Sequence, residues 1–155
     1  MSEYTAKIAW KRHPEEAFTD NKYSRGHSWE FDGGAVVAAS SAPSIVPPPY
    51  SVEANVDPEE AFIASLSSCH MLFFLAIAGK RGFVIDEYID SPLGIMEKDG
   101  DGNISITKVT LRPQVTFGGD TQPTLEKLEK LHHQSHDQCF IANSVKTEVV
   151  IEVVL

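Results

Sequence analysis

The fold is decided by one stretch, residues 57–79, which reads DPEEAFIASLSSCHMLFFLAIAG. Asp57 is a favourable helix cap, Pro58 suits the first helical position, and Glu60 stands three residues after the cap, as in a capping box. Apolar residues then occupy most of the helical circumference, and Gly79 is typical of a helix end. The stretch therefore predicts a long central helix that is buried nearly all round, in a core or an interface.

The length of the chain limits how such a helix can be covered. With 155 residues, the chain fits a single domain, residues 1–155, because one hydrophobic core usually spans about 100 to 200 residues. A monomer of this size has little room to enclose an apolar helix completely. We therefore expect a second copy of the chain to cover part of the helix, in a homodimer.

Composition and charge exclude several classes of protein. Hydrophobic residues make up 42% and charged residues 23%, which excludes intrinsic disorder as the main state. The net charge is −9, without a local basic patch, so nucleic acid is not expected as a partner. The amino terminus has no leader pattern, and the longest apolar run, Met71–Ala78, is too short to span a membrane. These features predict a soluble, cytoplasmic protein with no membrane partner.

Strand patterns precede the helix. Residues 4–11 alternate between apolar and polar side chains, which favours a half-buried strand. Residues 27–31 and 35–39 flank Asp32-Gly33-Gly34 and predict a hairpin. The proline-rich residues 40–55 disfavour both helix and central strand, so we expect a stiff, extended loop.

Further elements follow the helix. Residues 83–97 and 104–117 have strand-like patterns and surround an Asp/Gly turn. Residues 121–138 predict an amphipathic helix opened by Pro123. Residues 145–155 alternate between apolar and polar side chains, which predicts a strand. Strands and helices at unequal intervals favour an α+β fold over repeated βαβ units. The expected architecture is an antiparallel sheet packed with the long buried central helix.

Two cysteines are the main candidates for chemistry. Cys69 lies in the middle of the predicted central helix, and Cys139 follows the second helix. In an acidic chain without a leader, two thiols indicate redox chemistry, metal binding or packing. A thiol is a good nucleophile only as thiolate, which needs a nearby cation, and that cation needs a carboxylate to orient it. Arg25 and Glu59 are candidates for these two roles.

These residues resemble a known family. The stretch DPEEAF at residues 57–62, followed by SSCH at 67–70, resembles the helix start and first cysteine motif of the OsmC/Ohr family. The stretch HDQCFIANS at residues 136–144 resembles the second cysteine motif, and Arg25-Gly26 precedes the first hairpin as in that family. The resemblance runs from about residue 4 to the end, and it implies an OsmC-like fold that forms an intertwined homodimer.

The resemblance also implies an activity. The family contains thiol-dependent peroxidases that reduce organic hydroperoxides in oxidative-stress defence. By this resemblance Cys69 is the peroxidatic thiolate, Cys139 resolves its sulfenic acid as a disulfide, Arg25 stabilises the thiolate, and Glu59 positions Arg25. The implied scheme uses no bound cofactor. It needs an external dithiol reductant, such as a lipoyl protein or a thioredoxin-like protein.

Helix geometry limits how Glu59 can act at Cys69. Ten residues of continuous helix separate the two side chains by about 15 Å along the axis and about 280° around it. Either the helix is broken between them, or arginine and glutamate come from the partner chain of a dimer. We favour the second arrangement as a hypothesis.

Other interpretations compete with a peroxidase. A Cys/His metal site is one alternative, because His132, His136 and Cys139 lie near one helical face and His70 adjoins Cys69. A protein that binds a small apolar ligand without catalysis is another. A cysteine hydrolase is disfavoured because adjacent helical residues diverge by about 100°. The stretch DGDGN at residues 99–103 predicts a hairpin turn rather than a calcium loop, because the obligatory loop glycine is missing.

Overall fold

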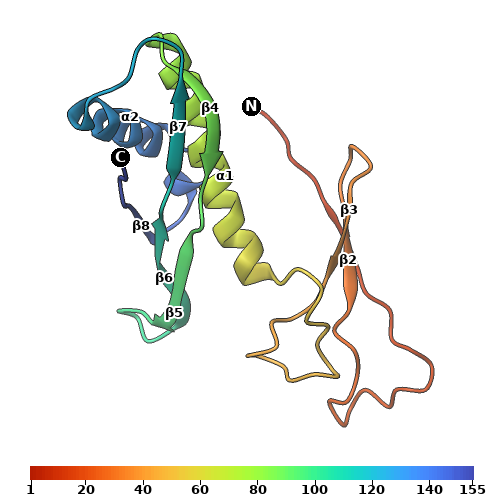
Figure 1. Cartoon of the computed structure of the whole chain (residues 1–155). Coiled ribbons are helices and arrows are strands. Elements are labelled where there is room, and N and C mark those ends of the chain that lie inside the picture. Colours follow the sequence, from red (N-terminus) through yellow and green to blue (C-terminus); the bar gives the residue numbers. More distant parts are fainter. The chain divides into compact units, whose positions relative to one another are not determined.

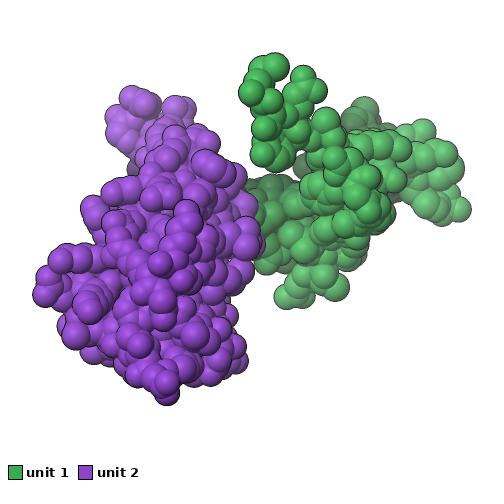
Figure 2. Space-filling view, turned by 90° about the horizontal axis from the view of Figure 1, so that it is seen from above, with its two compact units in different colours: residues 1–61 green, residues 62–155 purple.

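A computed structural model describes all 155 residues, and the chain divides into two compact units. The first unit is residues 1–61 and the second is residues 62–155 (Figure 2). Each unit is described by itself, and the expectation of one domain over residues 1–155 stays a prediction.

The first unit contains a small antiparallel sheet with strand order β1-β2-β3. Its strands are β1 (Lys7–Ala9), β2 (His27–Glu30) and β3 (Val36–Ala39). The predicted hairpin is confirmed, and Gly34 in its turn has a φ of 95°, which a glycine adopts without strain. The first strand is much shorter than the alternating pattern predicted. Residues 40–55 contain no helix or strand, as their prolines indicated.

The first unit buries very little of its own side-chain surface. Its only buried residues are Ala39, Ser40 and Ser51, and every residue of β1 and β2 is exposed or half-buried. A small three-stranded sheet is stable only when its apolar face packs against another element, such as a helix or a second sheet. The sheet therefore lacks a core of its own.

Helix α1 (Pro58–Lys80) starts as predicted. The Asp57 carboxylate accepts a hydrogen bond from the backbone amide of Glu60 at 2.8 Å, and the Glu60 carboxylate accepts one from the amide of Asp57 at 2.9 Å. This reciprocal pair is the capping box. The helix ends at Lys80, and Gly82 follows it with a φ of 82°.

Helix α1 is buried on one face within the single chain. Only one stripe is buried within the chain, formed by Leu66, His70, Phe74 and Ala78. Leu72 on the opposite side is 59% exposed. The single chain therefore leaves the opposite face of α1 uncovered, because residues 62–155 supply packing for one face only, and coverage of that face by a second copy stays a prediction. By length and composition alone α1 could also cross a membrane, a test that core helices of soluble proteins pass as well.

The second unit contains two sheets, and two of the three strand regions predicted in it, residues 83–97 and 104–117, are each split in two. The strands are β4 (Val84–Ile89), β5 (Leu93–Lys98), β6 (Ile104–Leu111), β7 (Gln114–Gly118) and β8 (Glu148–Ile151). Pro92 and Pro113 lie at the two breaks, where the missing amide interrupts pairing. As a result β4 pairs with β7, while β5 pairs with β6 around the predicted turn.

The remaining elements follow the predicted order with two corrections. Strand β8 lies parallel to β6, so this sheet is not antiparallel throughout. Helix α2 (Leu125–Gln138) begins later than predicted, because the Thr124 hydroxyl caps it by accepting a hydrogen bond from the Lys127 amide at 3.3 Å. A short 3-10 helix, η1 (Ala142–Ser144), joins α2 to β8.

Helix α1 connects the two apolar clusters of the second unit. Phe74 packs with Leu128 and Leu131 of α2, and this cluster also contacts β4 and β7. Leu66, farther toward the start of the helix, packs with Val109 and Leu111 of β6. Figure 1 shows α1 running alongside strands β4 and β7. Both α2 and the strands therefore take their positions from one stripe of α1.

Candidate thiol site

The structure brings the two cysteines together in the second unit. Cys69 lies on α1 and Cys139 is the cap residue at the end of α2, and the Cys69 side chain is close enough to raise the pKa of Cys139. Both are free thiols. Cys139 is 1% exposed, whereas Cys69 is half-buried. Two neighbouring free thiols are candidates for a disulfide.

Local backbone contacts hold Cys139 at the end of its helix. Its amide donates to the carbonyl of His136 at 3.2 Å, which closes the last turn of α2. The amide of Ala142 donates to the Cys139 Sγ at 3.5 Å. The sulfur is therefore fixed by the turn that leads into η1.

The electrostatic environment favours the neutral form of Cys139. Burial and, to a smaller extent, the neighbouring Cys69 side chain raise the pKa of this thiol to about 11, although the Ala142 amide opposes the shift. Cys139 is thus a thiol, not a thiolate, at neutral pH.

An aromatic pair adjoins the thiols. The rings of Phe73 and Phe140 meet edge to face with centroids 4.9 Å apart. Phe73 lies one helical turn after Cys69, and Phe140 follows Cys139 directly. This contact was not predicted from the sequence, although a phenylalanine stands within four residues after each cysteine.

A buried histidine pair also joins the two helices. His70 Nε2 and His132 Nδ1 lie 3.0 Å apart, and both residues are 1% exposed. His70 Nδ1 and His132 Nε2 are buried without a partner. Burial lowers the pKa of His70 to about 3, with contributions from His132 and His136, and burial lowers the pKa of His132 to about 4. Both imidazoles are therefore neutral at ordinary pH.

The contacts of these residues do not favour the Cys/His metal alternative. His132 Nδ1 is in hydrogen-bond contact with His70 Nε2, and the ionisable neighbour that raises the pKa of Cys139 is Cys69. No group of three or more His, Cys, Asp or Glu side chains is placed to hold a metal ion.

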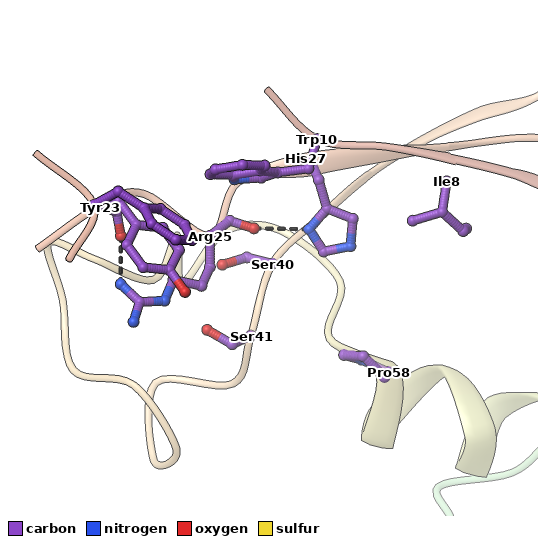
Figure 3. A pocket seen from close by; sticks show the side chains of 9 residues that line it. Ile8, Trp10, Tyr23, Arg25, His27, Ser40, Ser41 and Pro58 are labelled. Atoms are coloured by element: carbon purple, nitrogen blue, oxygen red, sulfur yellow. Dashed lines mark hydrogen bonds between the residues drawn. The ribbon is translucent and has the colours of Figure 1, made fainter. Parts of the chain in front are cut away.

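Arg25 lies in the first unit and is held by its own loop. Its guanidinium donates to the carbonyls of Asn21 and Tyr23 and, at 2.7 Å, to the Asn21 side-chain oxygen. The guanidinium carbon lies 3.7 Å from the centroid of the Tyr23 ring, a cation–π contact. Figure 3 shows the Arg25 side chain folded against Tyr23. Arginine has five N–H donors, so this arrangement leaves donors free for a ligand.

Arg25 also borders an apolar cavity of about 450 Å³ within the first unit. Its walls include the mutually packed rings of Trp10, Phe18 and Tyr23. His27 is another wall residue, and its Nε2 accepts a hydrogen bond from the Trp29 indole at 3.1 Å. Since indole N–H can only donate, the His27 proton is on Nδ1, which donates to the Arg25 carbonyl at 2.7 Å.

The predicted pairing of Glu59 with Arg25 is not formed. Glu59 is half-buried in the first turn of α1, and its Oε2 atom is buried without a hydrogen-bond partner. The donors of Arg25 are directed to Asn21 and Tyr23 instead. Helix α1 runs unbroken from Pro58 to Lys80, so Glu59 cannot reach Cys69 along the same helix.

Comparisons with known proteins identify the family. The family described as OsmC-like protein matches residues 52–154, which is well over half of the chain. The chain belongs to this OsmC-like family. It is also 60% identical to an OsmC-like protein of unknown function from Vibrio cholerae, whose solved structure matches with a TM-score of 0.98 over 99% of this chain and 100% of that chain. No curated protein sequence matches the chain.

More distant OsmC-like structures share the fold. An organic hydroperoxide resistance protein from Legionella pneumophila is 14% identical, with a TM-score of 0.70 over the full length of both chains. The organic hydroperoxide resistance protein OhrB of Bacillus subtilis is 19% identical, with a TM-score of 0.63 over 97% of this chain and 98% of that one. These likenesses confirm the predicted OsmC-like α+β fold.

Proposed function

We propose that this OsmC-like protein is a thiol-dependent peroxidase that reduces organic hydroperoxides in oxidative-stress defence. The observation that carries the proposal is the contact between the free thiols of Cys69 and Cys139. Structural neighbours named organic hydroperoxide resistance proteins add support through the shared fold.

The reaction follows from the two thiols. The Cys69 thiolate attacks one peroxide oxygen, the O–O bond breaks, and the products are Cys69 sulfenic acid and an alcohol. The Cys139 sulfur then attacks the Cys69 sulfur, and a disulfide and water form. An external dithiol, such as a lipoyl or thioredoxin-like protein, reduces the disulfide by thiol–disulfide exchange. No resident cofactor takes part in this scheme.

The different burial of the two thiols supports their assignment. Cys139 is fully buried, and its raised pKa keeps it protonated. Cys69 is the half-buried thiol and therefore the one that a hydroperoxide reaches. The accessible Cys69 thiol therefore suits the peroxidatic role. Cys139, which lies beside it, suits the resolving role.

A homodimer completes this proposed site. One stripe of α1 is exposed along its length, formed by Ala64, Ser68, Leu72, Leu75 and Gly79. By helical spacing, Cys69 stands between this exposed stripe and the buried one. The sheet of the first unit also lacks a core. A second copy of the chain would cover both surfaces and place its own residues beside Cys69.

Arg25 and Glu59 fit this site as contributions from the partner subunit. Arg25 keeps free guanidinium donors for a thiolate or a peroxide oxygen. The buried Glu59 oxygen has no partner, and a cation or hydrogen-bond donor there would satisfy it. In this arrangement Arg25 would leave part of its bonding to Asn21 and Tyr23, and Glu59 would then position it at Cys69 across the dimer.

The apolar cavity of the first unit favours a second candidate function. A cavity walled by aromatic rings suits a small apolar or aromatic ligand, held without chemistry at the thiols. A protein of this kind binds such a ligand whether or not Cys69 is present.

Turnover separates the two functions. We expect the wild-type protein to consume cumene hydroperoxide in the presence of a dithiol reductant, and we expect Cys69→Ser to abolish consumption. Ser68→Ala, one residue away on the same helix, is the matched control and should stay active. Consumption that survives Cys69→Ser would refute the assignment, and ligand binding without turnover would favour the second function.

Subunit mixing tests the shared site. Glu59→Ala and Cys69→Ser homodimers should both be inactive. Heterodimers of the two variants should recover part of the activity, since one of their two sites has both residues intact. No recovery after subunit exchange has been demonstrated would rule out the arrangement across the dimer.

A further inference from the structure

The His70–His132 pair connects the same two helices as the cysteines. On α1, His70 follows Cys69 directly, and on α2, His132 precedes Cys139 by seven residues. Seven residues are about two helical turns, so His132 and Cys139 lie on nearly the same face of α2. The histidine contact and the thiol contact are therefore two separate non-covalent contacts between the same pair of helices.

The histidine contact is directional. One imidazole must donate and the other must accept across the 3.0 Å between His70 Nε2 and His132 Nδ1. Neither residue has another hydrogen-bond partner, because His70 Nδ1 and His132 Nε2 are both unpaired. The polar interactions of the pair thus depend on this one bond, which fails if α2 rotates or slides along α1.

The surroundings of the pair strengthen this constraint. Phe74 stacks on the His132 ring with centroids 4.3 Å apart, and both histidines are 1% exposed. A hydrogen bond in such a low-dielectric interior is not replaced by water when it breaks. The bond consequently favours one register of α2 on α1, the register in which Cys139 meets Cys69.

We propose that the His70–His132 hydrogen bond is a positioning element that sets the effective concentration of the Cys139 thiol at Cys69. The pair acts through the helices and does not touch the reacting sulfurs. This role deepens the proposed peroxidase function, because rapid closure of the disulfide depends on that effective concentration. The effective concentration can be measured without any hydroperoxide.

The experiment is thiol–disulfide equilibrium with glutathione. Oxidised glutathione accepts two electrons from the Cys69 and Cys139 thiols, and the products are the protein disulfide and two reduced glutathione molecules. The ratio of disulfide to dithiol protein at known glutathione concentrations gives the effective concentration. The measurement uses the full chain and acid quenching, followed by mass spectrometry.

Two matched pairs of variants test the bond. The amide of glutamine reaches the place of the ring Nε2, so His70→Gln keeps the bond, while the shorter His70→Asn loses it. Likewise His132→Asn places an amide at the ring Nδ1 position, while His132→Leu removes the polar atom. In the two variants that keep the bond, we expect the effective concentration to match that of the wild type within about twofold. In the two variants that lose the bond, the effective concentration should fall about tenfold, the change expected when one hydrogen bond between buried groups is lost.

A stability control separates positioning from packing. Phe83→Leu weakens the same apolar cluster at a residue that stacks on neither imidazole, so it should lower the unfolding midpoint and leave the effective concentration unchanged. Equal effective concentrations in His70→Gln and His70→Asn, or a fall that follows stability in all variants, would overturn the proposal. If a variant that loses the bond does not fold, the other matched pair gives the same comparison. One further outcome would overturn the proposal in favour of a purely structural role. In that outcome His70→Asn and His132→Leu both fail to fold, while His70→Gln and His132→Asn, which keep the bond, both fold.

The same measurement distinguishes this inference from the proposed function. A wild-type protein that forms the disulfide with glutathione but does not consume hydroperoxide refutes the peroxidase and leaves the positioning role standing. A protein that consumes hydroperoxide equally fast in all four histidine variants, with unchanged effective concentrations, refutes the positioning role alone.

Discussion

Phe140 packs edge to face on Phe73, with ring centroids 4.9 Å apart. The contact joins the segment that follows Cys139 to the helical turn that follows Cys69, so it spans the same two segments as the thiols. Phe140 nevertheless remains 70% exposed. The ring contact with Phe73 is thus a specific restraint on a residue that the core does not enclose.

A double-mutant cycle measures this restraint. We expect Phe73→Ala and Phe140→Ala to couple by about 0.5 to 1.5 kcal/mol in the free energy of unfolding, the range for aromatic pairs. Urea denaturation of the wild type, both single variants and the double variant gives the coupling. Additive single-variant effects would show that the two rings do not stabilise each other.

The reactivity of Cys139 follows from its surroundings. Because burial raises its pKa to about 11, Cys139 should react slowly with iodoacetamide near pH 8, and its rate should rise with pH toward 11. The measurement uses Cys69→Ser, so that only one thiol is present. Burial, the largest cause, remains in this variant, so the pKa should stay above that of an ordinary cysteine. Rapid alkylation at pH 8 that levels off below pH 9 would contradict this account.

The buried histidines predict lower stability in acid. Their folded pKa values of about 3 and about 4 lie below the ordinary 6.5, so below pH 6.5 the unfolded chain binds more protons than the folded chain. Stability is then fully present above about pH 6.5 and is lost as the pH falls toward 4. Each histidine contributes a slope of up to about 1.4 kcal/mol per pH unit.

Urea unfolding at pH 7, 6 and 5 tests this prediction. The double variant His70→Leu/His132→Leu should lose less stability over this range than the wild type. Phe83→Leu provides the control, since it weakens the core without removing a titratable group and should keep the wild-type slope. Equal slopes in the wild type and the double variant would show that the pair is not held neutral in the folded state.

The capping box at the start of α1 contributes to stability. Asp57→Ala removes the acceptor for the Glu60 amide and should cost about 1 kcal/mol in the free energy of unfolding. Asp57→Asn preserves an acceptor and should recover most of this loss. Thermal unfolding of both variants checks the prediction, which fails if alanine and asparagine destabilise the protein equally.

Local patterns in the sequence predicted local structure well. The capping box at Asp57 and the glycine turn at Gly34 use hydrogen bonds and backbone angles set within a few residues, and both are present. The prolines of residues 40–55 also disfavoured helix and strand, and neither forms there. The two cysteines were recognised as a pair through the family motifs, and the structure places them in contact.

Contacts between distant segments were not predictable in the same way. Nothing near His70 in the sequence indicates His132 as its partner, because the pairing depends on how α2 packs against α1. Similarly, the alternation of residues 145–155 predicts a strand but not its parallel pairing with β6. The exposed stripe of α1 shows the same limit, since apolar composition does not reveal whether the covering surface belongs to the same chain.

The most direct test of the account is the fate of the two thiols after one equivalent of cumene hydroperoxide. Free-thiol titration and intact mass are compared for wild type, Cys69→Ser and Cys139→Ser, with hydrogen peroxide as the reference oxidant. We predict rapid loss of both thiols with a two-hydrogen decrease in mass, no rapid reaction in Cys69→Ser, and a trapped sulfenic acid in Cys139→Ser. Slow oxidation of both thiols that does not favour the organic hydroperoxide would contradict the account.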